Sequence, residues 1–235
     1  MKALQIVTAL VGVFCVAVGG AIIAYRVTYP AYTHRMKVFI EIEDGAEARS
    51  GSGVLEVELK FGLPVGPGLS CTIRGDAIPI ELKSGPVVAV LHQYYNEYLP
   101  TGGPAGQTRA GFCTLALVAY GLGGTPSQDA LQALASKSGR VGVPHRGIPS
   151  FVFFSDPKIP STAKLVLDED FPQVLGPGVR LRSVSLQLTN EPITRGVIQK
   201  IPAVAAVLSR KDGRESRRPR IYEPNPTDFS QGAIK

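Results

Sequence analysis

The chain has 235 residues, a formal net charge of +6 and 44% hydrophobic residues. That length suffices for one globular domain with an anchor and a tail. Charged residues make up only 19% of the chain, and the mean hydropathy of +0.12 excludes an ordinary soluble domain without a strongly apolar segment.

The excess of apolar residues lies near the N-terminus, where residues 4–25 contain no charged side chain. As a helix, this run would extend about 33 Å at about 1.5 Å per residue, enough to cross a hydrocarbon core of about 30 Å. A helix is also the form in which such a run satisfies its backbone hydrogen bonds in lipid. We therefore predict a transmembrane anchor at residues 1–25, with residues 4–25 bound to the lipid bilayer.

A cleaved secretory signal peptide is the rival interpretation of the same segment. Lys2 supplies a positive start, and residues 17–19 (Ala-Val-Gly) offer small residues at the spacing that cleavage requires. The apolar run continues past that site to Ile23, which favours retention. Whether residues 1–19 are removed stays open.

Charge around the anchor does not decide its orientation. Lys2 lies on one side, and Arg26, Arg35 and Lys37 lie on the other, a difference too small for the positive-inside rule. Because a chain that opens with Met-Lys and an apolar run usually keeps its N-terminus inside, we expect the globular domain outside the cytoplasm.

Strand patterns begin after a short stalk at residues 26–35. Apolar and polar side chains alternate with period two over residues 36–43 and 54–61, which is typical of strands with one buried and one solvated face. The polar, glycine-rich residues 44–53 between them suit a hairpin connection. We predict an antiparallel strand pair here.

Later segments predict more strands and one clear helix. Apolar runs at residues 87–91, 150–154 and 164–167 are typical of strands. Residues 125–138 predict a helix, because Thr125 starts a capping box with a proline at the first helical position and a glycine follows the apolar stripe.

A change of phase marks the last predicted strand. Over residues 179–189 the apolar positions shift from odd to even at Ser183, as an extra residue in one strand would cause, so we predict a β-bulge there. A short helix is expected from residues 190–192 to Pro202. Residues 36–208 thus predict a mainly β (α+β) domain of antiparallel strands with one or two short helices.

Residues 209–235 show no apolar periodicity and predict a disordered basic tail. Its cations would attract a polyanion such as anionic lipid headgroups. Sequence-specific nucleic-acid binding is not expected, because neither a recognisable module nor a set of stacking aromatic residues accompanies the charges. A merely solvated tail is the alternative. The cations are Arg210, Lys211, Arg214, Arg217, Arg218 and Arg220.

No motif specifies a reaction or a cofactor. The three histidines, His34, His92 and His145, lie outside the sequence contexts of serine and cysteine hydrolases. His145 is the loop candidate for a functional role, against a solvated loop residue. Ligands at close spacing, such as Cys-x-x-Cys, do not occur, so neither a metal nor a cofactor is expected. The acidic residues 168–170 are interpreted as a helix start.

The cysteines leave the compartment open. Cys71 and Cys113 would form one disulfide in an exported domain, and they would be buried thiols in a cytosolic one.

Three stretches carry a family resemblance: SGSGVLEV at residues 50–57, RGDAIPIEL at 74–82 and LTNEPITRG at 188–196. They resemble a group of proteobacterial membrane-anchored proteins of unknown function, and the similarity touches most of residues 36–202. The resemblance implies a bacterial envelope protein with an N-terminal hydrophobic segment. It brings no activity and no functional residue with it.

Together these features predict a non-catalytic interaction module, tethered by a single pass to the bacterial inner membrane, with an envelope protein as its partner. The alternative is a membrane-anchored envelope hydrolase that uses residues of the 93–109 and 143–147 loops. That alternative requires a pocket that joins the two loops and a titratable group with a shifted pKa.

Overall fold

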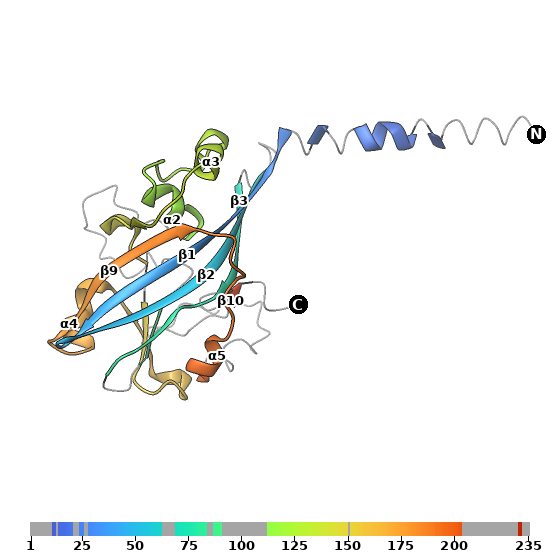
Figure 1. Ribbon diagram of the computed structural model, residues 1–235. Helices are drawn as coiled ribbons and strands as arrows, with labels where there is room; N and C mark the ends of the chain where they lie inside the picture. The colour runs from blue at the N-terminus through green and yellow to red at the C-terminus, as the bar shows by residue number, and fades with distance from the viewer. Residues whose placement is uncertain are drawn as a thin grey trace, which may run out of the picture. The chain divides into compact units, whose positions relative to one another are not determined.

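The computed structural model describes residues 11–12, 14–20, 24–25, 28–62, 69–83, 87–90, 112–149, 151–203 and 230–231. It confirms an antiparallel, β-rich domain with a few short helices (Figure 1). The chain divides into two compact units, Met1–Thr33 with Glu58–Cys71, and His34–Val57 with Thr72–Lys235.

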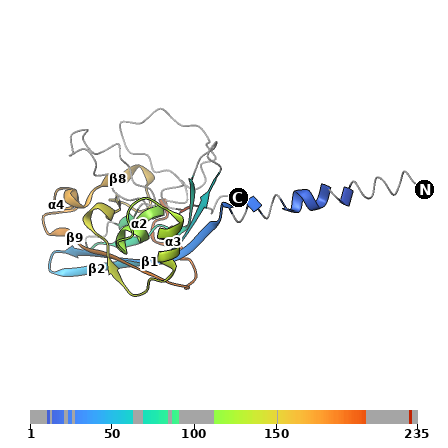
Figure 2. The same ribbon diagram turned by 90° about the horizontal axis from the view of Figure 1, so that it is seen from above.

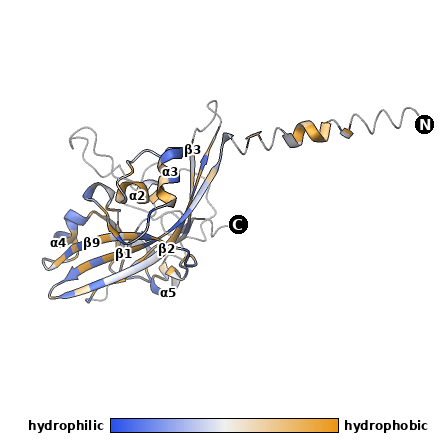
Figure 3. Ribbon diagram, turned by 45° about the horizontal axis from the view of Figure 1, so that its top comes forward, coloured by the Kyte–Doolittle hydropathy of each residue, from blue (hydrophilic) through white to orange (hydrophobic). Residues whose placement is uncertain are grey.

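The first unit contains the apolar N-terminal segment. Its described residues 11–12, 14–20 and 24–25 are helical, and the ribbon of this segment is coloured mostly as hydrophobic in Figure 3. The backbone N–H of Tyr29 donates to the carbonyl of Tyr25 at 2.8 Å. Among the described residues, none of the helices combines the length and the hydropathy that a membrane crossing requires.

Six strands form the larger sheet, in the order β10-β3-β2-β1-β9-β6. The long strands β1, β2 and β9 lie side by side in Figure 1. The strands are β1 (Ala31–Asp44), β2 (Glu47–Phe61), β3 (Leu69–Asp76), β6 (Val141–Gly142), β9 (Val179–Leu188) and β10 (Ser230–Gln231).

The predicted alternation in β1 is confirmed. Every second side chain from Met36 to Ile42 is fully buried, and the residues between them are partly exposed. The strand begins earlier than predicted, at Ala31, so that half of the expected stalk belongs to it. The sequence pattern missed residues 31–35 because their side chains do not alternate in hydrophobicity, and they precede the buried part of the strand. Their backbone nevertheless belongs to β1.

The hairpin between β1 and β2 is tighter than predicted. Only Gly45 and Ala46 connect the strands, and Gly45 adopts the left-handed φ of 67° that such a turn favours. A two-residue connection requires the antiparallel arrangement. Residues 47–53, which were expected in the connection, belong to β2. Their polar, glycine-rich sequence resembles a loop because this end of the strand is mostly solvent-exposed.

The β-bulge predicted near Ser183 is confirmed. Glu41 pairs with Ser183 and Ile42 pairs with Leu181, so Arg182 is the extra residue of β9. The insertion returns the apolar side chains on both sides of it to the buried face of the sheet.

The smaller sheet has four antiparallel strands in the order β4-β5-β7-β8. The strands are β4 (Pro79–Glu81), β5 (Val87–Val90), β7 (Phe151–Phe154) and β8 (Ala163–Val166). All four side chains of β7 are buried, as expected of a continuous apolar run. The predicted strands at 87–91, 150–154 and 164–167 are therefore confirmed to within a residue or so.

Beyond the N-terminal segment, the helices of the described chain are short. The α-helices are α2 (Phe112–Ala119), α3 (Gln128–Ala135), α4 (Phe171–Val174) and α5 (Val197–Lys200), and the 3-10 turns are η2 (His145–Gly147), η3 (Pro160–Thr162) and η4 (Asp168–Asp170). Helix α2 contacts both α3 and β9 (Figure 2).

Two predicted helix boundaries were wrong. Helix α3 is capped by Ser127, whose hydroxyl accepts from the N–H of Ala130 at 3.1 Å, and not by Thr125. The cap two residues later leaves a helix that buries Leu131 and Leu134 and ends at Ala135. The helix expected from residues 190–192 starts only at Val197, because the backbone of Thr194 and Gly196 bonds to β2 and β3 instead.

Those bonds form a junction between β2, β3 and the segment before α5. Thr194 bonds in both directions with the backbone of Val54, at 2.8 and 3.0 Å, and its carbonyl accepts from the N–H of Asp76 at 3.1 Å. The buried carboxylate of Asp76 then accepts from the N–H groups of Gly196 and Val197, at 2.7 and 3.2 Å. Removing these donors would destabilise the fold, because it would leave a buried charge without compensation.

Two residues of the predicted C-terminal tail are described by the structure. Ser230 and Gln231 form β10, which pairs antiparallel with Asp76 and Gly75 of β3. The predicted disordered tail at residues 209–235 therefore contains a short strand. The six cations between Arg210 and Arg220 lie outside the described residues.

We predict that Gly75→Ala destabilises the domain by about 2 kcal/mol or more. Gly75 has a φ of 124°, and a Cβ there would lie 2.8 Å from Leu55 Cδ2 and 2.9 Å from the carbonyl oxygen of Val54. Gly142→Ala is the matched control, because a Cβ at Gly142 meets nothing within 4 Å. Chemical denaturation of both variants checks this, and equal midpoints would contradict it.

Candidate functional site

Three side chains able to bind a metal or to take part in catalysis come from two 3-10 turns and lie close together. His145 comes from η2, and Asp168 and Glu169 come from η4; one ligand atom of each lies within 4.8 Å of the others. His145 Nε2 lies 3.6 Å from Asp168 Oδ2. The His145 side chain is 73% exposed and that of Asp168 is 11% exposed, so the cluster opens to solvent on the histidine side.

The turns that carry this cluster are held by buried neighbours. Phe171 follows η4 directly and is fully buried, with its ring 5.0 Å from that of Phe151 in the smaller sheet. On the other side, Gly147 is buried at the end of η2, where a Cβ would approach Val143 Cγ1 to 2.8 Å. The backbone under the three side chains is therefore fixed by packing.

The sequence patterns identified His145 as a loop candidate but did not predict this cluster. The expectation of no metal ligands rested on close spacing along the chain. His145 and Asp168 come from separate turns and meet only through tertiary packing. The acidic residues 168–170 were interpreted as a helix start, and this is confirmed: they form η4, which leads directly into α4, although neither helix has a side-chain cap.

A second feature is the solvent-facing side of the larger sheet, where charges pair across strands. Glu56 of β2 accepts from Arg74 at 2.7 Å and from Arg35 at 2.8 Å. Its side chain is only 13% exposed. The hydrogen bonds from Arg74 and then Arg35 hold the pKa of Glu56 below its ordinary value, so this group stays ionised.

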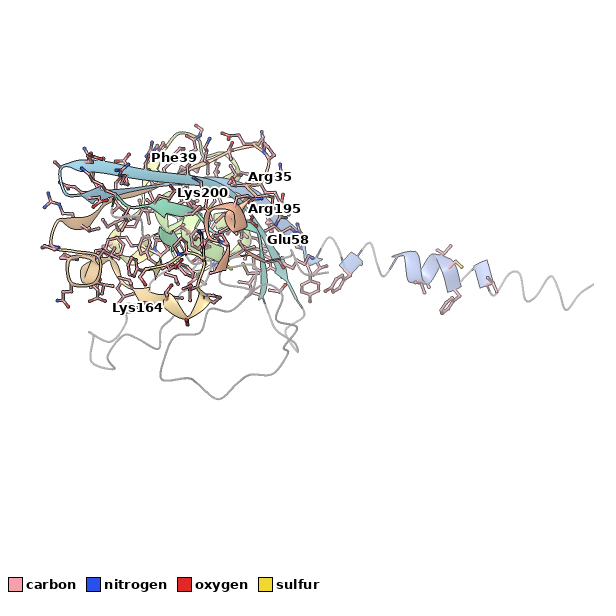
Figure 4. All side chains as sticks on the ribbon, turned by 90° about the horizontal axis from the view of Figure 1, so that it is seen from below. Arg35, Phe39, Glu58, Lys164, Arg195 and Lys200 are labelled. Carbon is pink, nitrogen blue, oxygen red and sulfur yellow. The ribbon has the colours of Figure 1, made fainter. Side chains whose placement is uncertain are left out.

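The same face continues across β1 to β9. The guanidinium of Arg140 stacks over the ring of Phe39 at 4.1 Å and donates to Ser185 Oγ at 2.7 Å. Arg180 forms a two-point ion pair with Glu43, at 2.7 and 2.9 Å. Figure 4 shows Arg35 and Phe39 along β1. We call this surface the charged face; it comprises Arg35, Lys37, Phe39, Glu41, Glu43, Glu56, Arg74, Arg140, Arg180 and Arg182.

Cys71 and Cys113 are each disulfide-bonded, and Cys15 is a free, exposed thiol. This settles the alternative that the sequence left open in favour of the bond. Persistent disulfides occur mainly in oxidising compartments. The bond is therefore compatible with a domain outside the cytoplasm.

The other predicted site residues are distributed as follows. His34 was placed in the stalk, yet it belongs to β1 and is largely buried. His92, the loop at residues 93–109 and the cations from Arg210 to Arg220 lie outside the described residues. The 143–147 loop is described and carries His145.

No family model, curated protein or solved structure matches this chain. The resemblance to proteobacterial membrane-anchored proteins therefore stays a prediction. Its three stretches do meet in the fold, because the backbone bonds of Thr194 join Val54 to the segment around Asp76.

We predict that His34 makes the fold sensitive to acid. Burial lowers the pKa of His34 from 6.5 to about 4, and His34 Nε2 has no hydrogen-bond partner among the described residues. Below pH 6.5 the unfolded chain binds a proton that the folded chain does not, so stability falls as the pH drops from about 6.5 to about 4. The full shift corresponds to about 3 kcal/mol, and the partial exposure of the ring reduces this to about 2 kcal/mol.

The check is chemical denaturation of the wild type and His34→Gln at several pH values. Glutamine does not titrate, so the variant should lose about 2 kcal/mol less stability than the wild type over this interval. Parallel pH profiles for the two proteins would show that His34 does not contribute.

Proposed function

We propose that this chain is a membrane-tethered, non-catalytic interaction module of the bacterial envelope, with residues 4–25 as its anchor. One observation carries the tether: the helical residues in this stretch expose large apolar side chains, with Val11 56%, Phe14 69% and Val16 76% exposed. Exposed apolar surface is unfavourable in water by about 25 cal/mol per Å². Lipid removes that penalty for a helix that has all its backbone groups paired.

The side of the membrane follows from cysteine chemistry in this proposal. A disulfide between Cys71 and Cys113 would be reduced in the cytosol of an ordinary bacterium. The same bond outside the cytoplasm adds stability, about 4 kcal/mol for a closed loop of this length by chain entropy. The proposal therefore places the globular domain on the non-cytoplasmic side of the inner membrane.

The charged face supplies the interaction surface in the proposal. Its ion pairs fix the positions of long side chains, which reduces the entropy that binding would otherwise cost. Arg140 stacked on Phe39 gives one solvent-accessible arginine–aromatic pair, and both residue types are enriched where proteins bind each other. An envelope protein with a complementary charge pattern is the proposed partner. The basic residues between Arg210 and Arg220 are proposed to attract anionic lipid or another polyanion.

One observation favours the second candidate, an envelope hydrolase. His145 lies in the 143–147 loop, and its Nε2 is 3.6 Å from Asp168 Oδ2, so a small movement of the exposed histidine would bring it within hydrogen-bond reach of a carboxylate that could orient it as a general base. In that case Asp168 would bind the Nε2 side of the ring, and the Nδ1 side would act on a bound water. A hydrolase requires His145→Ala to abolish turnover of an envelope ester or amide, and the interaction module does not.

The tether is tested by fractionation of cells that produce the full chain. We expect the wild type in the membrane fraction, resistant to alkaline carbonate and released by detergent, because apolar helices partition into lipid. A variant without residues 4–25 should move to the soluble fraction. Intact, full-length wild type in a detergent-free soluble extract would refute the tether.

The interaction is tested on protein solubilised with mild detergent. A partner should copurify reproducibly with the wild type. Arg140→Glu should lose it, because this change removes the stacked cation from the charged face. Lys164→Glu is the control, since Lys164 is an exposed residue of β8 in the smaller sheet and is not part of the charged face (Figure 4). Equal recovery of the partner with both variants would argue against the charged face.

A further inference from the structure

We propose that His145, Asp168 and Glu169 form a binding site for a divalent transition-metal ion, with Zn²⁺ as the probe. The proposal goes beyond the tether and the charged face and does not depend on either. It starts from the convergence of one imidazole and two carboxylates from two separate turns, with ligand atoms within 4.8 Å of one another.

The distances suit a metal better than they suit a hydrogen bond. His145 Nε2 and Asp168 Oδ2 are 3.6 Å apart, beyond the range of about 2.7–3.2 Å for a good N–H···O bond. Two ligand atoms of a tetrahedral zinc ion, each about 2.0–2.2 Å from the metal, lie about 3.3–3.6 Å apart. An ion between the two atoms therefore needs little movement of either side chain.

The donor set defines the class of ion. Imidazole nitrogen suits zinc, copper, iron and nickel, and carboxylate oxygen is accepted by all of them. Calcium and magnesium, in contrast, are bound by oxygen ligands, so the histidine disfavours them. Three protein ligands leave at least one coordination position for water or for a group from a partner.

The turns under the ligands are rigid, which lowers the entropy that metal binding costs. At the end of η2 the N–H of Ile148 donates to the carbonyl oxygen of His145 at 3.1 Å. At η4 the N–H of Asp170 donates to the carbonyl oxygen of Leu167 at 3.0 Å. Leu167 and Phe171, which flank η4, are buried. The exposed side chains of His145 and Glu169 are the ligands with room to adjust.

The same side chains allow a simpler arrangement, in which protonated His145 forms an ion pair with Asp168 and binds no metal. The two arrangements differ in their response to added metal. An ion pair is insensitive to Zn²⁺, and a ligand set binds it with one ion per chain. They also predict different effects of a Glu169 substitution, because Glu169 is a ligand in the metal site and takes no part in the ion pair between His145 and Asp168.

The experiment is calorimetric titration of tag-free, detergent-solubilised full chain with Zn²⁺, after treatment with a chelator. We expect one Zn²⁺ per chain, and binding at least about tenfold weaker in each of His145→Ala, Asp168→Asn and Glu169→Gln. The same titration with Ca²⁺ should give much weaker binding. Circular dichroism checks that each variant is folded, and the exposed Glu169 provides a variant with little effect on packing.

Asp170→Asn is the matched control, because it removes a carboxylate from the same turn at a residue that is not part of the cluster. This variant should bind Zn²⁺ as the wild type does. No saturable binding to the wild type would overturn the proposal. Binding that is unchanged in the three ligand variants, or weakened equally by Asp170→Asn, would also overturn it. None of these results bears on membrane retention, so the tether stands or falls separately.

Discussion

One-sided burial of β1 is the constraint on which the sheet depends. Met36, Val38, Ile40 and Ile42 are all 0% exposed, and burial of four such side chains contributes about 6–12 kcal/mol, which is comparable to the whole stability of a typical domain. A slip of one residue in the register would place charged residues such as Lys37 in the core. The register is therefore fixed, and the opposite side of the strand must be polar. The bulge at Arg182 keeps β9 in phase with this pattern.

Because one side of β1 is buried, its other side is polar and forms part of the charged face. In addition, the charges of this face are paired across strands. Across strands, Glu56 joins Arg35 and Arg74, and Arg180 joins Glu43. Individual surface ion pairs contribute little to stability, about 0–1 kcal/mol, so their value in the proposed function lies in holding long side chains in place. The His145 cluster depends on different elements: its acidic half is positioned by Phe171, which packs on Phe151 of the smaller sheet.

Local pattern predicted much of this fold, because period-two burial and bulges are recorded in the order of apolar residues. The strands around Met36, the bulge beside Ser183 and the buried β7 were all predicted from that order. Residues 47–53 are the mostly exposed start of β2 and carry polar side chains, so the local sequence pattern suggests a loop. Only the pairing of this segment with a neighbouring strand identifies it as part of β2. The cap at Ser127 lies two residues from its predicted position because several residues in a row are able to cap a helix. The approach of His145 to Asp168 is a tertiary contact, which spacing along the chain does not record.

The proposed function combines an N-terminal helix in lipid with a disulfide-bonded, water-exposed sheet, and it requires the sheet to lie on the non-cytoplasmic side of the membrane that the helix spans. A pair of reporter fusions after Lys235 tests this requirement most directly. We expect a reporter enzyme that matures only outside the cytoplasm to be active there, and a fluorescent reporter that matures only in the cytosol to stay dark. A bright cytosolic reporter together with an inactive exported one would contradict the account, because the sheet would then lie in the compartment that reduces the bond between Cys71 and Cys113.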